Sequence, residues 1–283
     1  MTTLSPTELP AARASAPRLP SSGRLGLARG AVELRQFLRS REAVGFSLIF
    51  PALLLILLGS IFKDSYGEHS EASAAQVFSA SMIAYGIIST AFITMGVGIA
   101  ADREDGTLKR LRGTPMTVLA YFIGKLTVVA VATVAEVALM LGVGVAVFDM
   151  PLPDEPGRWL TFAWVLGLSI VACTAMGVTA SSLVRSARSA GVVLNVPVVA
   201  LQFLSGIFVH PITMLPQWMV TVASFFPVKW MGQGFRSVFL PDSMAAHEMT
   251  GGWEHGRTAL VLGAWCVVGL AACLMTFRWT EDR

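Results

Sequence analysis

The chain has 283 residues, of which 54% are hydrophobic and only 14% are charged, and its mean hydropathy is +0.65. Soluble globular proteins carry about 25% charged residues, so this composition excludes an ordinary water-soluble domain and indicates an integral membrane protein. The net charge of +3 comes from basic residues spread over the loops between apolar runs. Nucleic-acid binding would gather basic residues on one soluble face, so we expect no nucleic-acid partner.

Residues 1–22 are rich in proline, serine and alanine and show no apolar periodicity. Such a segment cannot bury enough apolar surface to offset the entropy lost on ordering it. We therefore expect a disordered cytosolic tail.

Between this tail and the first apolar run, residues repeat at helical spacing. The apolar positions are Leu27, Ala31, Leu34 and Leu38, and the basic positions are Arg24, Arg35, Arg39 and Arg41. This pattern predicts an amphipathic helix that lies along the cytoplasmic membrane interface. The alternative is that the arginines are only the positively charged flank of the first span.

Six apolar runs are long enough to cross a hydrocarbon core of about 30 Å, which takes about 20 helical residues. They are residues 44–62, 77–100, 126–148, 159–184, 191–209 and 258–277. Sixteen of the 21 lysines and arginines lie in the N-terminal segment, the loops after the second and fourth runs, and the C-terminal tail. Because basic residues are retained on the cytoplasmic side, we predict a multi-pass protein of the cell's inner membrane with both termini cytoplasmic.

A charged segment between the second and third runs, from Asp102 to Lys125, is the clearest candidate for contact with a cytosolic protein. Gly106 breaks the chain after an acidic cluster, and Leu108 and Leu111 follow three residues apart among basic residues. The pattern predicts a short cytosolic helix with one apolar edge. The alternative is a positively charged loop with incidental periodicity.

Three polar side chains within the apolar runs are candidates for a substrate path. Glu136 stands near the middle of the third run, and Asn195 and Gln202 lie seven residues apart on one face of the fifth. Glu136 is interpreted either as a protonatable or cation-attracting site or as the structural partner of a neighbouring helix. Asn195 and Gln202 are interpreted either as part of the substrate cavity or as interhelical hydrogen bonds at a dimer seam.

The segment from His210 to Arg257 is long, and its first half places apolar residues between prolines. We predict a re-entrant segment that dips into the membrane and covers the exit. Irregular backbone persists at membrane depth only where protein or a water-filled cavity satisfies its polar groups. The alternative is an aromatic belt at the level of the lipid headgroups, formed by Trp218, Trp230 and Trp253.

Neither a metal site nor a nucleotide site is predicted. The three cysteines lie within apolar runs, and the four histidines are scattered without metal-ligand spacing. A phosphate-binding loop needs Gly-x-x-x-x-Gly-Lys before serine or threonine, but the only Gly-Lys pair, Gly124-Lys125, precedes Leu126. We therefore expect a chain that binds no cofactor and is not an enzyme by itself.

Two sequence blocks resemble the type-2 permeases of ATP-binding cassette (ABC) transporters, over a stretch from about residue 25 to the end of the chain. The first block is Asp-Arg-Glu-Asp-Gly-Thr-Leu from Asp102 to Leu108, with Thr114-Pro115 and Gly124-Lys125-Leu126, and is similar to the family's coupling helix. The second is Ser205-Gly206-Ile207-Phe208, Pro211, Leu215-Pro216-x-Trp218, Pro227 and Arg236, and is similar to its outer re-entrant segment. Asp102, where glutamate is common, and the polar Arg112-Gly113 pair depart from the family pattern.

The resemblance implies a single transmembrane domain over residues 23–283. This domain would be an all-α bundle of six spans with the interfacial helix, the coupling helix after the second span and the re-entrant segment between the fifth and sixth. ATPase contact is implied for Asp102, Glu104, Gly106, Thr107, Leu108, Leu111, Thr114 and Pro115. An outer gate is implied for Pro211, Leu215, Pro216, Trp218, Pro227 and Arg236.

The implied function is that of the permease subunit of an ATP-driven exporter. Two permeases would pair as a homodimer or heterodimer and bind separately encoded cytosolic ATPase subunits, which hold ATP and magnesium. The implied substrate is hydrophobic or amphipathic, such as a drug or antibiotic. The alternative within this class is an exporter of lipid, lipid-linked glycan or polysaccharide. The alternatives outside it are an ion-coupled secondary transporter that uses Glu136 and a non-transporting membrane scaffold.

Overall fold

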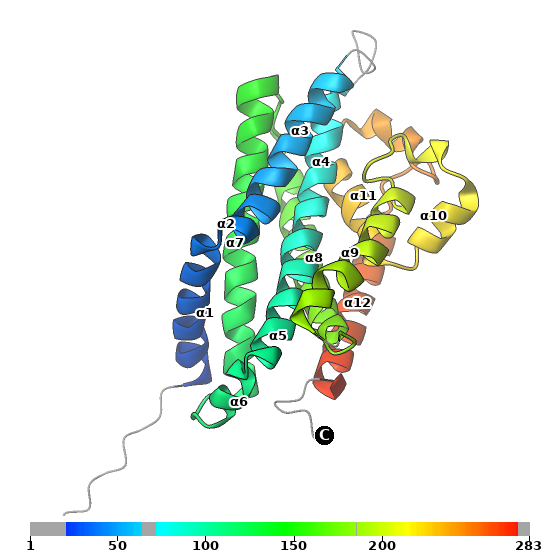
Figure 1. Cartoon of the computed structure of the whole chain (residues 1–283). Coiled ribbons are helices and arrows are strands. Elements are labelled where there is room, and N and C mark those ends of the chain that lie inside the picture. The colour runs from blue at the N-terminus through cyan, green and yellow to red at the C-terminus, as the bar shows by residue number, and fades with distance from the viewer. Residues whose placement is uncertain (1–20, 64–71, 185, 277–283) are drawn as a thin grey trace, which may run out of the picture.

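The computed structural model describes residues 21–63, 72–184 and 186–276, and within these ranges the regular structure is entirely helical (Figure 1). Six helices are long and apolar enough to cross a membrane. They run over Arg41–Ile61, Ala74–Glu104, Val118–Phe148, Pro156–Ser181, Ala187–Leu204 and His255–Thr276. The prediction of an all-helical protein with six candidate spans is confirmed.

Two of the spans are divided by π-helical turns. Span 1 comprises α2 (Arg41–Val44), the π turn η1 (Gly45–Ile49) and α3 (Phe50–Ile61), and span 2 comprises α4 (Ala74–Ile87), the π turn η3 (Ile88–Thr94) and α5 (Met95–Glu104). The two π turns meet, since the Ser47 and Thr94 hydroxyl oxygens lie 3.3 Å apart. Hydropathy gives no sign of either turn, so neither was predicted.

The remaining elements follow in chain order. They are α1 (Ser22–Arg39) before span 1, α6 (Thr107–Arg112), α7 (Val118–Phe148), α8 (Pro156–Ser181), α9 (Ala187–Leu204), η4 (Ile212–Met214), α10 (Gln217–Ala223), α11 (Pro227–Phe239), η5 (Asp242–His247) and α12 (His255–Thr276). The fifth span ends at Leu204 rather than at residue 209, because Gly206 has a φ of 71° and turns the chain out of the helix.

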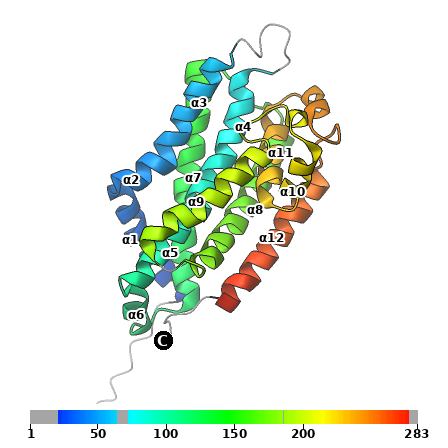
Figure 2. The ribbon, with the colours of Figure 1, turned by 45° about the vertical axis from the view of Figure 1, so that its right-hand side comes forward.

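Span 2 is the central helix of the bundle. Almost every residue of α4 is buried, and α4 contacts α3, α7, α8 and α11. Figure 2 shows α4 and α5 running through the middle of the molecule and ending beside α6. A displacement of α6 therefore acts on the helix against which most of the other spans pack.

Helix α1 packs side by side with the first half of α7 (Figure 1). A Cβ atom at Gly26 would lie 2.7 Å from Ile123, and one at Gly30 would lie 2.9 Å from Thr127, so only glycine permits this close approach. The apolar residues predicted on one edge of α1 do not face α7: Leu27, for example, is 58% exposed. The position of α1 at a membrane interface stays a prediction. The expected tail over residues 1–22 lies outside the described residues, except that residue 21 caps α1 and residue 22 begins it.

The close contact between α8 and the π turn of span 2 gives a test of this packing. A Cβ atom at Gly177 would lie 2.6 Å from the Phe92 carbonyl oxygen, whereas one at Gly167 in the same helix meets nothing within 4 Å. We expect Gly177→Ala to destabilise the protein by about 1–3 kcal/mol, because the backbone must move apart, and Gly167→Ala to have little effect. Thermal unfolding of the detergent-purified variants measures the difference. Equal melting temperatures would contradict the described packing.

Candidate functional site

The first candidate site is the turn between α5 and α6. Gly106 adopts a φ of 70° between the two helices, a conformation that costs other residues about 1–2 kcal/mol. It therefore lets α6 leave the axis of span 2, and α6 lies at one end of the molecule (Figure 1). Around this turn, Lys109, Arg110 and Arg112 are exposed.

The two leucines of α6 differ in exposure. Leu108 is only 2% exposed and packs inside the chain, whereas Leu111 is partly exposed. Leu111 is therefore the apolar side chain of α6 that another protein can reach. Its role in docking stays a prediction.

The threonines and the proline of this segment shape the ends of α6. The Thr107 hydroxyl accepts a hydrogen bond from Arg110 at 3.0 Å, and the Thr114 hydroxyl donates one to the Leu111 carbonyl at 2.7 Å. The Leu111 carbonyl also accepts from the Thr114 backbone N–H at 3.0 Å, so Thr114 holds the end of α6 with both its donors. Thr114 and Pro115 are exposed, so the structure leaves both available to a partner.

The charged residues at the end of α5 contact other parts of the same chain. The Asp102 carboxylate lies 2.7 Å from the Lys125 ammonium and accepts a hydrogen bond from the Tyr121 hydroxyl at 3.0 Å. The sequence places Tyr121 and Lys125 in the charged segment before the third run, but it does not show that they pair with Asp102, because in the fold both belong to α7. Only their position beside α5 in the fold shows the link.

The next two residues bind the connection between α8 and α9. The Arg103 guanidinium donates a hydrogen bond to the Val184 carbonyl, and the Glu104 carboxylate accepts one at 2.6 Å from the Ala187 backbone N–H. Ala187 is the first residue of α9, where an acidic side chain is favoured by the free N–H groups and the helix dipole. The end of span 2 is therefore tied to spans 3, 4 and 5 by consecutive side chains.

The second candidate site is the outer segment around α11. All 13 residues of α11 are buried, among them Arg236 in its last turn. The Arg236 Nε atom is 2.6 Å from the Glu248 carboxylate, and both side chains are 0% exposed. The Arg236 guanidinium also donates to the Gly206 carbonyl at 3.4 Å, at the turn that ends span 5. Glu248 was missed because its pairing depends on how the segment folds back.

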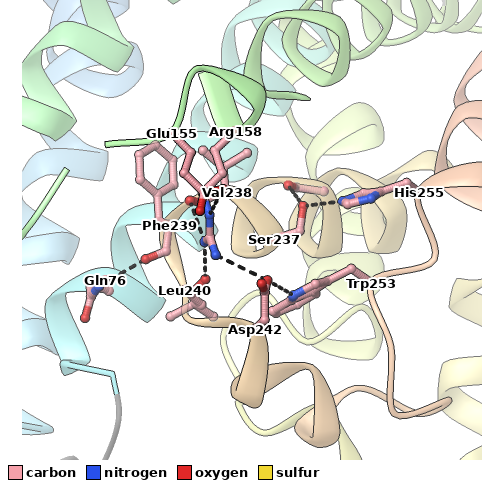
Figure 3. Close-up of polar contacts among 11 residues, drawn as sticks. Gln76, Glu155, Arg158, Ser237, Val238, Phe239, Leu240, Asp242, Trp253 and His255 are labelled. Carbon is pink, nitrogen blue, oxygen red and sulfur yellow. Dashed lines mark hydrogen bonds and ion pairs between the residues drawn. The ribbon is translucent and has the colours of Figure 1, made fainter. Parts of the chain in front are cut away.

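Side chains from spans 2 and 4 satisfy the end of α11 (Figure 3). Arg158 donates to the Leu240 carbonyl at 2.6 Å and to the Val238 carbonyl at 3.3 Å, and Gln76 donates to the Phe239 carbonyl at 3.0 Å. These carbonyls belong to the last turn of α11 and have no partner within the helix. The contacts provide what a re-entrant backbone needs in lipid.

The predicted gate residues differ in their positions along this segment and in their exposure. Pro211 precedes η4, Pro216 precedes α10, and Pro227 begins α11, so the prolines mark the breaks between its short helices. Leu215 follows η4 and is partly buried, while Trp218 on α10 is 62% exposed. Their role in gating stays a prediction.

Of the three tryptophans assigned to an aromatic belt in the alternative interpretation, Trp230 is buried and donates to the Ser224 carbonyl at 2.8 Å. A buried indole with an internal partner is not free to lie at the headgroups. This position weakens the belt interpretation for Trp230.

Two titratable side chains of this segment, His210 and Lys229, have lowered pKa values. Burial lowers the pKa of the His210 imidazole to about 3, and the nearby Arg236 and His247 add to the effect, so His210 is neutral near pH 7. Burial also lowers the pKa of the Lys229 ammonium, although Glu254 at 3.8 Å opposes the shift. Neither group lies within a candidate span.

The substrate-path candidates occupy different environments. Glu136 is 1% exposed, one carboxylate oxygen lies 3.4 Å from the Thr90 hydroxyl, and a Cβ atom at Gly86 would overlap the other. The carboxyl group thus fills a notch in span 2 made by a glycine. Gln202 is also buried and Asn195 is half-buried, and both lie on α9, where a separation of seven residues keeps them two turns apart on one face. Their role in a substrate path stays a prediction.

Among the residues that the structure describes, no group of three or more histidine, cysteine, aspartate or glutamate side chains lies close enough to hold a metal ion.

Comparison with known proteins gives a family match over most of the chain. Residues 30–240 match the family described as ABC-2 type transporter. The chain is 24% identical over 151 residues to the probable multidrug ABC transporter permease YbhR of Escherichia coli K12, which covers 53% of this chain and 40% of YbhR. It is 22% identical over 203 residues to the putative transport permease YvfS of Bacillus subtilis 168, which covers 71% of this chain and 80% of YvfS. The match thus spans less than half the length of YbhR.

The buried ion pair between Arg236, in the last turn of α11, and Glu248 gives a test of this segment. Arg236→Met leaves the Glu248 carboxylate buried without its cation, so we expect a loss of about 3–5 kcal/mol in the free energy of unfolding. The double variant Arg236→Met with Glu248→Leu removes both charges and should recover most of the lost free energy of unfolding.

Arg257→Met is the matched control, because Arg257 is 68% exposed and pairs with Glu254 at the surface. An exposed pair contributes about 0–1 kcal/mol, so little change is expected. Chemical unfolding of the three variants measures these differences. A double variant no more stable than Arg236→Met would contradict the assigned pairing.

Proposed function

Because the chain belongs to the ABC-2 type transporter family, we propose that it is the transmembrane permease subunit of an ATP-driven exporter. Permease domains of this family are non-catalytic and bind no cofactor, and ATP is used by a partner ATPase. Six helices of the described residues are long and apolar enough to cross a membrane, as a permease subunit requires.

The observation that carries the proposal is the position of α6 at the end of the central span. In the proposed mechanism α6 docks on a cytosolic ATPase, and the partly exposed Leu111 enters an apolar groove there. ATP binding closes two ATPases and displaces α6. The displacement reaches span 2 directly and reaches spans 3, 4 and 5 through the contacts of Asp102, Arg103 and Glu104. ATP thereby shifts the population between two conformations, as its differential affinity requires.

The proposed orientation places α6 in the cytosol of a multi-pass inner-membrane protein. The first residues of α1, helix α6 and the end of α12 lie at one end of the bundle (Figure 1), as expected when both termini share one side. The basic loops predicted to be cytoplasmic belong to the same end. The segment from η4 to η5 lies away from α6 in the view of Figure 1, and we propose that it covers an exit on that side.

The proposed substrate is a hydrophobic or amphipathic molecule such as a drug. Support comes from the name of YbhR, a probable multidrug ABC transporter permease, and from the resemblance to the efflux group. A lipid or lipid-linked glycan is the second candidate, which the same scaffold would carry.

Glu136 gives little support to an ion-coupled carrier. Its carboxylate contacts Gly86 and Thr90 of the neighbouring span, which fits the structural role considered from the sequence. We propose that a second permease pairs with this one and that Asn195, half-buried on α9, contributes to the seam.

Leu111→Asp tests the docking of α6. A charge placed in an apolar groove is strongly unfavourable, so we expect at least a tenfold loss of drug-stimulated ATP hydrolysis, equivalent to about 1.4 kcal/mol. The measurement uses the chain purified with the ATPase of its neighbouring gene, across a panel of amphipathic drugs and lipids. Leu152→Asp is the control, because it introduces the same charge at an exposed leucine in the α7–α8 connection. Drug-stimulated ATP hydrolysis that is unchanged in Leu111→Asp would contradict the proposal.

A further inference from the structure

Lys125 joins three elements that lie far apart in the sequence. Its ammonium lies 2.7 Å from the Asp102 carboxylate at the end of α5 and 3.0 Å from the Glu33 carboxylate on α1. Lys125 itself belongs to α7. One cation thus bridges the end of span 2, the start of span 3 and the helix that precedes span 1.

The bridge is buried and its charges balance. The side-chain exposures are 10% for Lys125, 8% for Glu33 and 19% for Asp102. Arg29 pairs with Glu33 at 2.7 Å, and Tyr121 donates a hydrogen bond to Asp102. Without Lys125, two carboxylates would face each other in a site with little water, which disfavours keeping the three elements together.

Helix α1 and the first half of α7 are in addition packed as one unit. Gly26 and Gly30 bring the two backbones together, and the Ser22 and Thr117 hydroxyl groups are hydrogen-bonded at 3.1 Å. Such close packing transmits displacement rather than absorbing it. Whatever moves Lys125 therefore moves α1.

We propose that Lys125 is a positioning residue that makes α1 a moving part of the transporter. In this view, α1 and the first half of α7 move as one rigid unit, and the ion pairs of Lys125 link this unit to the end of span 2 beside α6. The inference rests on the proposed function, because α6 supplies the displacement. It goes beyond that function by giving α1, expected from the sequence to be an interfacial anchor, a share in coupling.

The experiment measures the position of α1 in the two nucleotide states. Spin labels at Leu38→Cys on α1 and Leu274→Cys on α12 use positions that are 60% and 75% exposed. The labelled chain is purified with the ATPase of its neighbouring gene and compared without nucleotide and with ATP and vanadate. We expect the distance between the labels to shift in the otherwise unchanged chain and the shift to be lost in Lys125→Met. Lys125→Arg keeps the cation and should keep the shift.

Lys63→Met is the matched control, since Lys63 is an exposed lysine just after α3, outside the docking helix α6, and its loss should leave the shift unchanged. The double variant Ser22→Cys with Thr117→Cys allows a disulfide to fix α1 to α7. The native cysteines are buried within spans, and the pair at positions 22 and 117 is oxidised before the spin labels are attached to the cysteines at positions 38 and 274. Because the two helices move as one unit, oxidation should leave the shift and ATP hydrolysis intact.

The results separate this inference from the proposed function. A shift that persists in Lys125→Met, or that oxidation of the new pair abolishes, overturns the inference while leaving the proposed function standing. If Lys125→Met does not fold, the Lys125→Arg and disulfide arms still decide. ATP hydrolysis that does not respond to Leu111→Asp removes the proposed function, and the inference falls with it.

Discussion

A bilayer offers no water to unpaired polar groups, and this constraint determines where the irregular parts of the chain are placed. At three of the breaks, the start of α9, the end of α11 and the turn at Gly206, a side chain from another element satisfies the backbone. Glu104 accepts from the first N–H of α9, and Arg158 and Gln76 donate to the carbonyls at the end of α11. The caps come from other spans, so the same bonds that satisfy the breaks also hold the spans together.

Span 2 takes part in most of these contacts between spans. It supplies Gln76 to the outer segment at one end and Asp102, Arg103 and Glu104 to the neighbouring helices at the other. Between these ends it is buried by α3, α7, α8 and α11. A helix held at both ends and along its length is suited to carry a displacement across the membrane, and α6 is attached to it by a single glycine turn.

The sequence was sufficient for the parts that depend on local composition. Apolar length located the six spans, and Gly106 located the turn before α6. It was insufficient where partners are distant in the chain. The packing face of α1 is set by Gly26 and Gly30, which carry no hydropathy signal, and Lys125 was treated as a positive flank because Glu33 and Asp102 approach it only in the fold.

Burial on every face of α11 affects how the topology of this chain would be mapped by chemical labelling. All 13 of its residues are buried, so cysteines placed along it would resist water-soluble reagents as if they lay in a span. A helix of this length rises only about 20 Å, short of the hydrocarbon core of about 30 Å. If protection from labelling were taken as the sign of a span, α11 would be counted as an extra membrane crossing, and α12 would be assigned the opposite orientation. Reagents that report depth in the bilayer are therefore needed to count the spans.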